Sequence, residues 1–374
     1  MDYEKYRDIA PYRGEDYDAA VKRLKDNIGL LRMFVETLLG TDDPEKIDKF
    51  FNYIVNNLDN AKNYDEFMHG VTAGVLVPTV MKKTMADFTT SGMEKLEKGK
   101  GYLFIGNHRD IVLDCAILDY ALLAKDLPFC EMAFGDNLII NQFVEDLFRL
   151  NGGVVIRRNL QMRAKYLETL RISSYFNEVI KEENRSVWIA QKSGRSKNGI
   201  DETAPSIIKM FHLSQKSLGK TFSETMNSLN IVPIAISYEN DPNDINKARE
   251  EVAKATKGKY EKRKLEDAIS MVKGMREWKG RVHLAFCEPV KGEFESPEEV
   301  AALIDKEIHT GYKLWPNSMF CYDYLEKSDR FKEETKDFDG EEFLSHYAHL
   351  SEDVRNFVLN SYANPVRSYI KDNG

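Results

Sequence analysis

The chain of 374 residues is 42% hydrophobic and 30% charged, which is typical of globular proteins and excludes a disordered, collagen-like or disulfide-stapled chain. Its formal charge of −8 argues against general nucleic-acid binding, in which basic patches supply most of the affinity. The four cysteines show no CxxC spacing and no apolar leader is visible, so we predict reduced thiols in a cytoplasmic protein. No apolar run reaches the ~18 residues that a membrane span requires.

The first hundred residues carry the spacing of amphipathic helices. Between Val21 and Leu38, apolar residues recur every three or four positions, which predicts one helix ending at Gly40. Asp43-Pro44 then supplies a cap and a first-turn proline for a second helix. We predict a helical N-terminal subdomain over residues 1–95 that packs on the rest of the chain, with a membrane-surface role as the alternative.

From about residue 101, short apolar runs alternate with helical patterns. The runs are expected to form buried strands, and this alternation predicts an α/β layered domain over residues 96–320. A proline in one run, Pro233, suggests a sheet edge or the start of a strand. The predicted strands are 102–106, 130–134, 153–156, 186–190, 231–237 and 282–286, with helices around 111–123 and 160–180.

Two charged stretches follow. A basic cluster contains Lys254, Lys257, Lys259, Lys262, Arg263 and Lys264, and it could face anionic lipid or an acidic carrier protein. Residues 323–342 hold nine acidic and four basic residues, which predicts an exposed linker before a last helix near 341–361. Residues 321–374 are therefore expected to be an acidic linker and a C-terminal helix.

The first candidate for chemistry is the segment Asn107-His-Arg-Asp-Ile-Val-Leu-Asp114, which follows a predicted strand and opens a helix. A histidine there can remove a proton from an alcohol, and a carboxylate can fix its tautomer. Asp114 and Asp110 are both possible partners for His108. The alternative is a histidine that only caps a helix.

Three further blocks follow in the sequence. In Gly152-Gly-Val-Val-Ile-Arg-Arg158, Arg157 and Arg158 could hold a phosphate or form surface ion pairs. In Lys192-Ser-Gly-Arg-Ser196, a turn after a strand offers backbone N–H groups and positive charge to an anion. The block 231–239, Ile-Val-Pro-Ile-Ala-Ile-Ser-Tyr-Glu, is apolar and mostly structural on its own terms.

In this order the four blocks resemble the glycerolipid acyltransferase family, which includes glycerol-3-phosphate and 1-acylglycerol-3-phosphate O-acyltransferases. The family pattern is N-H-x4-D, G-x-x-F-I-R-R, E-G-x-R-S and V-P-(I/V)-x-x-x-Y. The resemblance covers about residues 100–290 and implies a mixed sheet flanked by helices.

The resemblance also implies acyl transfer from acyl-CoA or an acyl carrier protein to a glycerolipid hydroxyl, without a metal or other cofactor. His108 would be the general base and Asp114 would orient it. Arg157 and Arg158 would hold the acceptor phosphate. The same pocket would include the residues Ser193, Gly194, Arg195 and Ser196, with Pro233 shaping the cleft.

The chain departs from the family pattern at two positions. Five residues rather than four separate His108 from Asp114, so either the turn carries an extra residue or Asp110 takes the orienting role. The glutamate before Gly-x-Arg-Ser is replaced by Lys192 or Ser193, depending on a one-residue shift in the alignment.

These observations lead to one principal hypothesis and two alternatives. We predict a peripheral O-acyltransferase of phospholipid biosynthesis at an anionic membrane surface, on the inner face of the cytoplasmic membrane. The acceptor is expected to carry a phosphate, and a non-phosphate lysolipid is the alternative acceptor. The alternative class is a non-catalytic protein of the same fold that binds lipid or acyl carrier protein.

Overall fold

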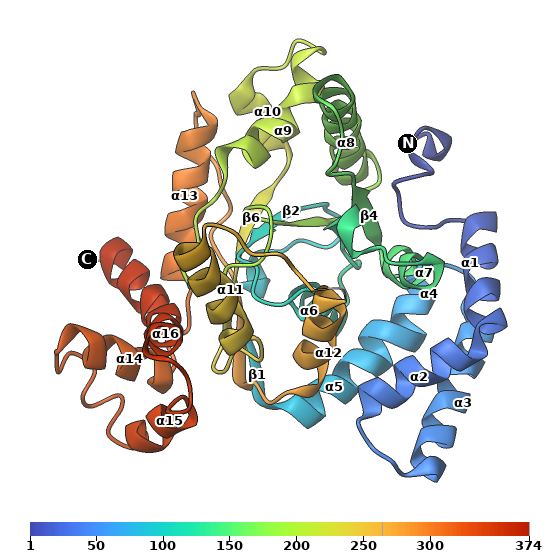
Figure 1. Ribbon diagram of the computed structural model, residues 1–374. Coiled ribbons are helices and arrows are strands. Elements are labelled where there is room, and N and C mark those ends of the chain that lie inside the picture. The colour runs from blue at the N-terminus through green and yellow to red at the C-terminus, as the bar shows by residue number, and fades with distance from the viewer. Residues whose placement is uncertain (264, 374) are drawn as a thin grey trace.

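The computed structural model, which describes residues 1–263 and 265–373, is built around one seven-stranded sheet (Figure 1). The strand order is β1-β7-β6-β2-β5-β3-β4, and every neighbouring pair is parallel except β6 and β7. The predicted mixed α/β sheet flanked by helices is confirmed. The strands are β1 (Met85–Ser91), β2 (Leu103–Gly106), β3 (Glu131–Gly135), β4 (Gly153–Ile156), β5 (Val187–Ala190), β6 (Ile231–Tyr238) and β7 (Gly280–Phe286).

The strand β1 corrects the expectation that the first hundred residues are all helical. It forms an edge of the sheet, and only Met85 among its residues is fully buried. An exposed edge strand needs no apolar run, so the sequence carried little signal for it. The consecutive helices therefore end at Thr84, and the 3-10 helix η3 (Met93–Lys95) follows β1.

Pro233 does not mark a sheet edge or a strand start. It lies inside β6, between β2 and β7, opposite Ile105. Its carbonyl accepts from the Cys287 N–H, and the regular β6–β7 register stops at Ile234 and Phe286. Because proline has no N–H, Pro233 cannot donate a hydrogen bond back to Cys287, and the regular pairing of β6 with β7 ends at this point.

The N-terminal helices are arranged in a layer at one side of the sheet (Figure 1). The predicted single helix over 21–38 is wrong: α1 ends at Asp26 and α2 starts at Ile28, because the Asn27 side chain bonds back to the Arg23 carbonyl. The elements are α1 (Glu15–Asp26), α2 (Ile28–Leu39), α3 (Pro44–Asn60), α4 (Tyr64–Phe67), the π-helix η2 (Met68–Leu76) and α5 (Val77–Thr84).

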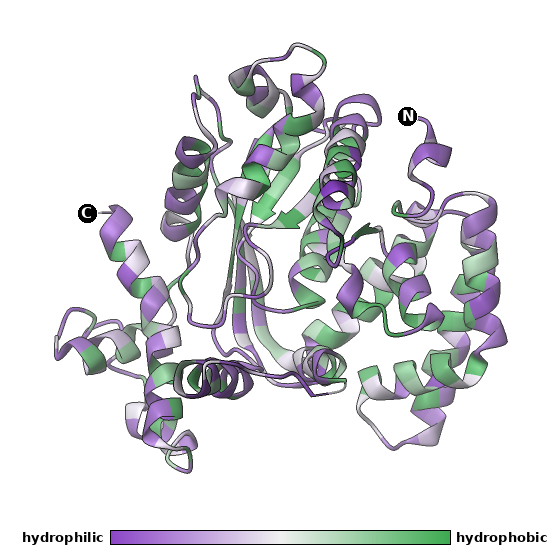
Figure 2. Cartoon of the chain, turned by 45° about the horizontal axis from the view of Figure 1, so that its top comes forward, coloured by the Kyte–Doolittle hydropathy of each residue, from purple (hydrophilic) through white to green (hydrophobic). Residues whose placement is uncertain are grey.

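Helices cover both faces of the sheet, and the apolar residues gather on the strands and the inward helix faces (Figure 2). The predicted helices around 111–123 and 160–180 are confirmed as α6 and α8. The helices of this domain are α6 (Leu113–Ala124), α7 (Gln142–Leu150), α8 (Met162–Glu182), α9 (Pro205–Lys216), α10 (Phe222–Ser228), α11 (Asp244–Lys257), α12 (Glu266–Arg276) and α13 (Pro297–Thr310).

The C-terminal segment differs from the predicted exposed linker and single helix. It forms α14 (Pro316–Glu326), α15 (Gly340–His346) and α16 (Glu352–Asn373), with α14 packed against α16. Phe338 of the acidic stretch and the adjacent Phe343 pack on Phe320, and Phe331 packs on Tyr322. Aromatic residues among the charges thus help to form a small hydrophobic core, which the segment shares with Ala248 of α11.

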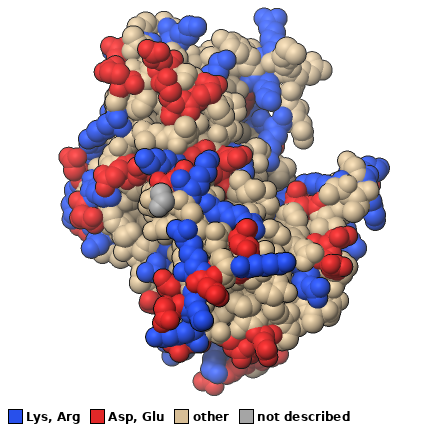
Figure 3. Space-filling model, turned by 90° about the vertical axis from the view of Figure 1, so that its left-hand side faces the viewer, with Lys and Arg blue, Asp and Glu red and all other residues tan. Residues whose placement is uncertain are grey.

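The basic cluster is largely paired with acids. Lys254 contacts Glu250 and Glu251, and both Lys259 and Lys262 have acidic partners. Figure 3 shows positive and negative side chains interspersed on the face that carries this segment. Lys264 lies outside the described residues. The charge that this segment can offer to an anionic partner is smaller than the sequence alone suggests.

Within residues 1–263 and 265–373, none of the helices combines the length and the apolar character that a membrane crossing requires.

Candidate active site

The His108 loop begins where β2 ends at the carboxyl edge of the sheet. Asn107 follows β2, and its side-chain amide exchanges two hydrogen bonds with the backbone of Ile236 in β6, at 2.8 and 3.0 Å. These two side-chain bonds take the place of backbone hydrogen bonds between neighbouring strands and hold the loop against β6. The chain then turns and enters α6 at Leu113.

His108 and Asp114 are in direct contact. The Nδ1 atom of His108 lies 2.8 Å from Oδ2 of Asp114. The same carboxylate oxygen accepts the backbone N–H groups of Arg109 and Asp110, at 2.6 and 2.9 Å. Because Asp114 already accepts these bonds, Nδ1 of His108 is the donor in the pair and Nε2 carries the lone pair.

Tyr238, at the end of β6, completes the surroundings of Asp114. Its hydroxyl donates to Oδ1 of Asp114 at 2.9 Å. Burial, followed by the negative charge of Asp114, raises the pKa of Tyr238 well above its usual value, so the phenol keeps its proton. Four hydrogen bonds therefore fix the carboxylate that faces His108.

Asp110 occupies a different position. Its Oδ1 accepts the N–H groups of Val112 and Leu113, so it caps the turn into α6 rather than contacting His108. Burial and the neighbouring charge of Asp114 raise the pKa of Asp110. The extra residue of the H-x5-D spacing is accommodated in this turn, and the structure places Asp114 beside the histidine.

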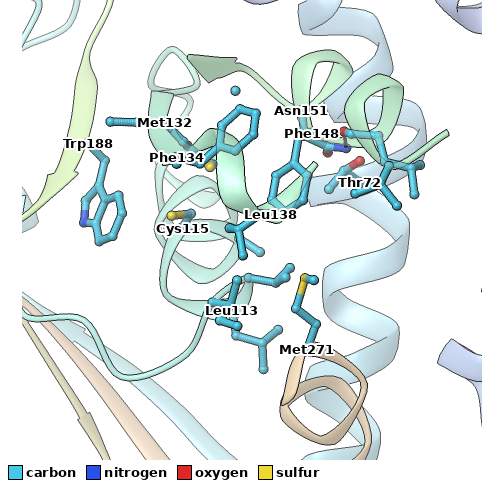
Figure 4. A pocket seen from close by; sticks show the side chains of 18 of the residues that line it. Thr72, Leu113, Cys115, Met132, Phe134, Leu138, Phe148, Asn151, Trp188 and Met271 are labelled. Atoms are coloured by element: carbon cyan, nitrogen blue, oxygen red, sulfur yellow. Dashed lines mark hydrogen bonds between the residues drawn. The ribbon is translucent and has the colours of Figure 1, made fainter. Parts of the chain in front are cut away.

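His108 lines a large cavity of about 850 Å³ between the sheet and the N-terminal helices. Its imidazole stands edge-on to Trp188 of β5, with ring centroids 5.5 Å apart. The walls are mostly apolar and come from α2, η2, α6, α7 and α12; Figure 4 shows Cys115, Met132, Phe134 and Leu138 between Trp188 and Met271. A volume and lining of this kind suit a long apolar ligand.

The two arginines of the second block both line this cavity, but their guanidinium groups have different surroundings. Arg157 contacts Asp8 at 2.5 Å, and Asp8 is also bound by Arg171. Arg158 lies against Gly135, where a Cβ atom would collide with its guanidinium, and it forms no ion pair within the described part of the chain. Arg158 is thus the arginine whose charge remains available at the cavity.

The turn after β5 brings further groups to the cavity. Lys192, Ser193 and Gly194 line it, and Gly194 has a φ of +84°, which favours glycine. Ser196 does not line the cavity. Its backbone N–H donates to the His108 carbonyl at 2.7 Å, and this bond joins the turn to the histidine loop. Arg195 also lies outside the cavity lining, and its positive charge acts on Asp110.

A buried charge network lies behind the loop. Arg109 pairs with Asp201 at 2.6 Å and with the hydroxyl of Ser196 at 3.2 Å. Burial lowers the pKa of Arg109, but Asp201 together with Tyr312, Asp241 and Asp114 more than offsets this, and the pKa is raised. Tyr312 donates to the same carboxylate. Pro233, expected to shape the cleft, is part of the sheet core and does not line the cavity.

Several groups of this site were not predicted from the sequence. Tyr238 ends the motif of the fourth block and Trp188 lies in the predicted strand 186–190, but neither pattern marked these side chains as part of the site. Asp201 lies in a segment without a distinguishing pattern. Lys165 of α8, which lines the cavity, carried no signal either. Among residues 1–263 and 265–373, no three His, Cys, Asp or Glu side chains are grouped so that they could hold a metal ion.

The sequence and the fold of this chain can be compared with those of known proteins. Residues 87–237 match the model of the family described as Acyltransferase, a range that contains the first three blocks and most of the fourth. The predicted resemblance to an acyltransferase family is thereby confirmed over these residues. No curated protein matches the sequence of the chain.

One solved structure similar to this chain is that of the 1-acyl-sn-glycerophosphate (LPA) acyltransferase PlsC from Thermotoga maritima. The alignment has 14% sequence identity and a TM-score of 0.35, and it covers 78% of this chain and 92% of that chain.

Proposed function

We propose that the protein transfers a fatty acyl group from a thioester, acyl-CoA or acyl carrier protein, to the hydroxyl of a phosphate-bearing glycerolipid acceptor. The observation that carries the proposal is the His108–Asp114 pair, which lies within the residues that match the Acyltransferase family and at the wall of a large apolar cavity. The acceptor is 1-acylglycerol-3-phosphate or glycerol-3-phosphate.

In the proposed reaction, Nε2 of His108 takes the proton of the acceptor hydroxyl while the hydroxyl oxygen attacks the thioester carbonyl carbon. The C–S bond then breaks, and the imidazolium returns the proton to the departing thiolate. Asp114 holds the imidazole through Nδ1 and stabilises its positive charge. General base catalysis of this kind contributes about 10²–10⁴ in rate.

The acceptor phosphate is proposed to bind to basic side chains of the cavity lining. Arg158, Lys165 and Lys192 belong to this lining. A guanidinium without an internal partner can form two parallel hydrogen bonds with a phosphate. Arg157, which is held by Asp8, would contribute mainly by fixing the strand end.

Access to lipid substrates is proposed to occur at an anionic membrane surface, on the inner face of the cytoplasmic membrane. The cavity-lining helices α2 and α12 contact each other and expose Met33 and Ile269. The double variant Met33→Glu/Ile269→Glu should reduce co-sedimentation with anionic vesicles. Leu218→Glu, at an exposed leucine outside the cavity lining, should not, and equal binding by all three proteins would contradict this contact.

The proposed reaction is tested by thiol release from palmitoyl-CoA and from palmitoyl acyl carrier protein. Each donor is paired with glycerol-3-phosphate, with 1-acylglycerol-3-phosphate and with a lysolipid that lacks phosphate. We expect acceptor-dependent release that requires the phosphate. Saturable binding of acyl ligands without release for any pair would contradict the proposal and favour the non-catalytic binding protein.

A further inference from the structure

Asp201 is a fully buried carboxylate that lies behind the His108 loop and does not line the cavity. A charge in such a place is costly unless hydrogen bonds and a cation compensate it. One oxygen of Asp201, Oδ2, accepts from Nη2 of Arg109 at 2.6 Å, from Nδ2 of Asn107 at 3.4 Å and from the hydroxyl of Tyr312. This atom therefore joins the histidine loop to the segment that follows α13.

The two loop residues that donate to Asp201 are the neighbours of His108 on either side. Asn107 is bonded in addition to the backbone of β6 through both ends of its amide. Arg109 donates its backbone N–H to Asp114 at 2.6 Å, and its carbonyl accepts from Nζ of Lys247 at 2.7 Å. The backbone before and after His108 is thus anchored, and Asp201 is bonded to both anchors.

The position of Asp201 is itself fixed by the C-terminal part of the chain. Its backbone carbonyl lies 2.7 Å from Nε2 of His309 in α13. Nδ1 of His309 lies 2.5 Å from a carboxylate oxygen of Asp372 in α16. Contacts from two helices and from Tyr312 therefore hold the carboxylate to which the histidine loop is bonded.

We propose that Asp201 is a positioning residue for His108. By holding Asn107 and Arg109 with one charged oxygen, it sets the place from which the imidazole meets both Asp114 and the acceptor hydroxyl. The inference rests on the proposed function, because that function assigns the role of general base to His108.

The first test is the steady-state kinetics of Asp201→Asn. This variant keeps an oxygen that can accept from Arg109 but removes the charge, and its amide nitrogen can replace Oδ1, which has no hydrogen-bond partner. We expect kcat to fall about ten- to a hundredfold, because a displacement of about 1 Å at the reacting groups has effects of this size. KM for donor and acceptor should change little, since Asp201 does not line the cavity.

Tyr312→Phe is a milder second variant, which removes one donor to Asp201 and keeps the ring. It should lower kcat less than Asp201→Asn does. An unchanged kcat in folded Asp201→Asn, or a raised KM at unchanged kcat, would overturn the proposal.

Asp146→Asn is the matched control. Asp146 is also buried and pairs with an arginine, Arg23, at 2.6 Å, but it lies in α7 outside the cavity lining. Both variants should unfold at lower urea concentrations than the wild type, and only Asp201→Asn should lose kcat. An equal decrease of kcat in the two variants would reduce the role of Asp201 to general stability and overturn the proposal.

A second readout does not depend on turnover. The hydrogen between Nδ1 of His108 and Asp114 gives a downfield proton resonance in NMR spectra, identified by its absence from His108→Ala. Asp201→Asn should shift or broaden this resonance, and Asp146→Asn should leave it unchanged.

The two readouts let the two proposals fail separately. A resonance that responds to Asp201→Asn in a protein that transfers no acyl group would overturn the proposed reaction and leave the positioning of His108 in place. Acyl transfer by the wild type, with kcat and the resonance unaffected by Asp201→Asn, would overturn the positioning role alone.

Discussion

The two ends of the cavity differ in how their polar groups are bonded. At the His108 end, Asp114 accepts four hydrogen bonds and its geometry is fixed before any substrate arrives. At the opposite end, Thr72 and Asn151 retain unpaired oxygen atoms. The comparison indicates that the His108 end is the one whose polar groups are organised for a reaction before a substrate binds.

The largest effect is expected from Asp114→Asn, because the new amide would turn donor hydrogens toward groups that are themselves donors. We expect kcat to fall by about 10²–10⁴. Asp110→Asn is the matched control: it keeps the oxygen that caps α6 and should change kcat little. Steady-state kinetics measures kcat for variants whose circular dichroism spectra are native. A larger decrease of kcat in Asp110→Asn than in Asp114→Asn would make Asp110 the orienting carboxylate.

The next largest effect separates the two arginines. Arg158→Ala should raise KM for the phosphate-bearing acceptor about tenfold or more, since a hydrogen bond to a charged group contributes about 1.5–3 kcal/mol. Arg157→Ala should affect KM less and lower the free energy of unfolding by at most about 1 kcal/mol, because it loses only a partly exposed ion pair. Similar KM values for both variants would show that Arg158 has no special role.

Tyr238→Phe tests whether the fixed geometry at the His108 end contributes to the rate. It removes one of the four bonds to Asp114 and leaves the ring in place. We expect kcat to decrease about three- to tenfold while KM for the acceptor stays the same. If kcat is unchanged, the hydroxyl of Tyr238 only satisfies a buried carboxylate.

Asp119→Asn tests how a buried carboxyl group in the cavity wall affects stability. The raised pKa of Asp119 means that the folded protein binds its proton more tightly than the unfolded chain. Stability therefore falls as pH rises above the ordinary aspartate pKa, by up to about 1.4 kcal/mol per pH unit until the folded-state pKa is reached. Asp119→Asn should remove this slope and be more stable near neutral pH, as measured by urea unfolding between pH 5 and 8. Parallel stability curves for the two proteins would contradict the burial of a neutral carboxyl group.

Much of the sheet could be predicted from the sequence, because buried strands are continuous apolar runs. The edge strand β1 could not, since its residues are mostly exposed, and the break at Asn27 depends on one local side-chain bond. The blocks containing His108, Asp114 and Arg158 were visible as motifs. The resemblance to the family also favoured Asp114 over Asp110 as the partner of His108. The difference between Arg158 and Arg157 could not be predicted, because it depends on Asp8, which is distant in the sequence.

The most direct test of the account is acceptor-dependent thiol release by His108→Ala beside the wild type. His212→Ala serves as the control, because that ring bonds to Thr225 and does not line the cavity. The account predicts a loss of at least about 10² in rate for His108→Ala, with the fold intact, and a normal rate for His212→Ala. Release by folded His108→Ala within a few-fold of the wild type would contradict it.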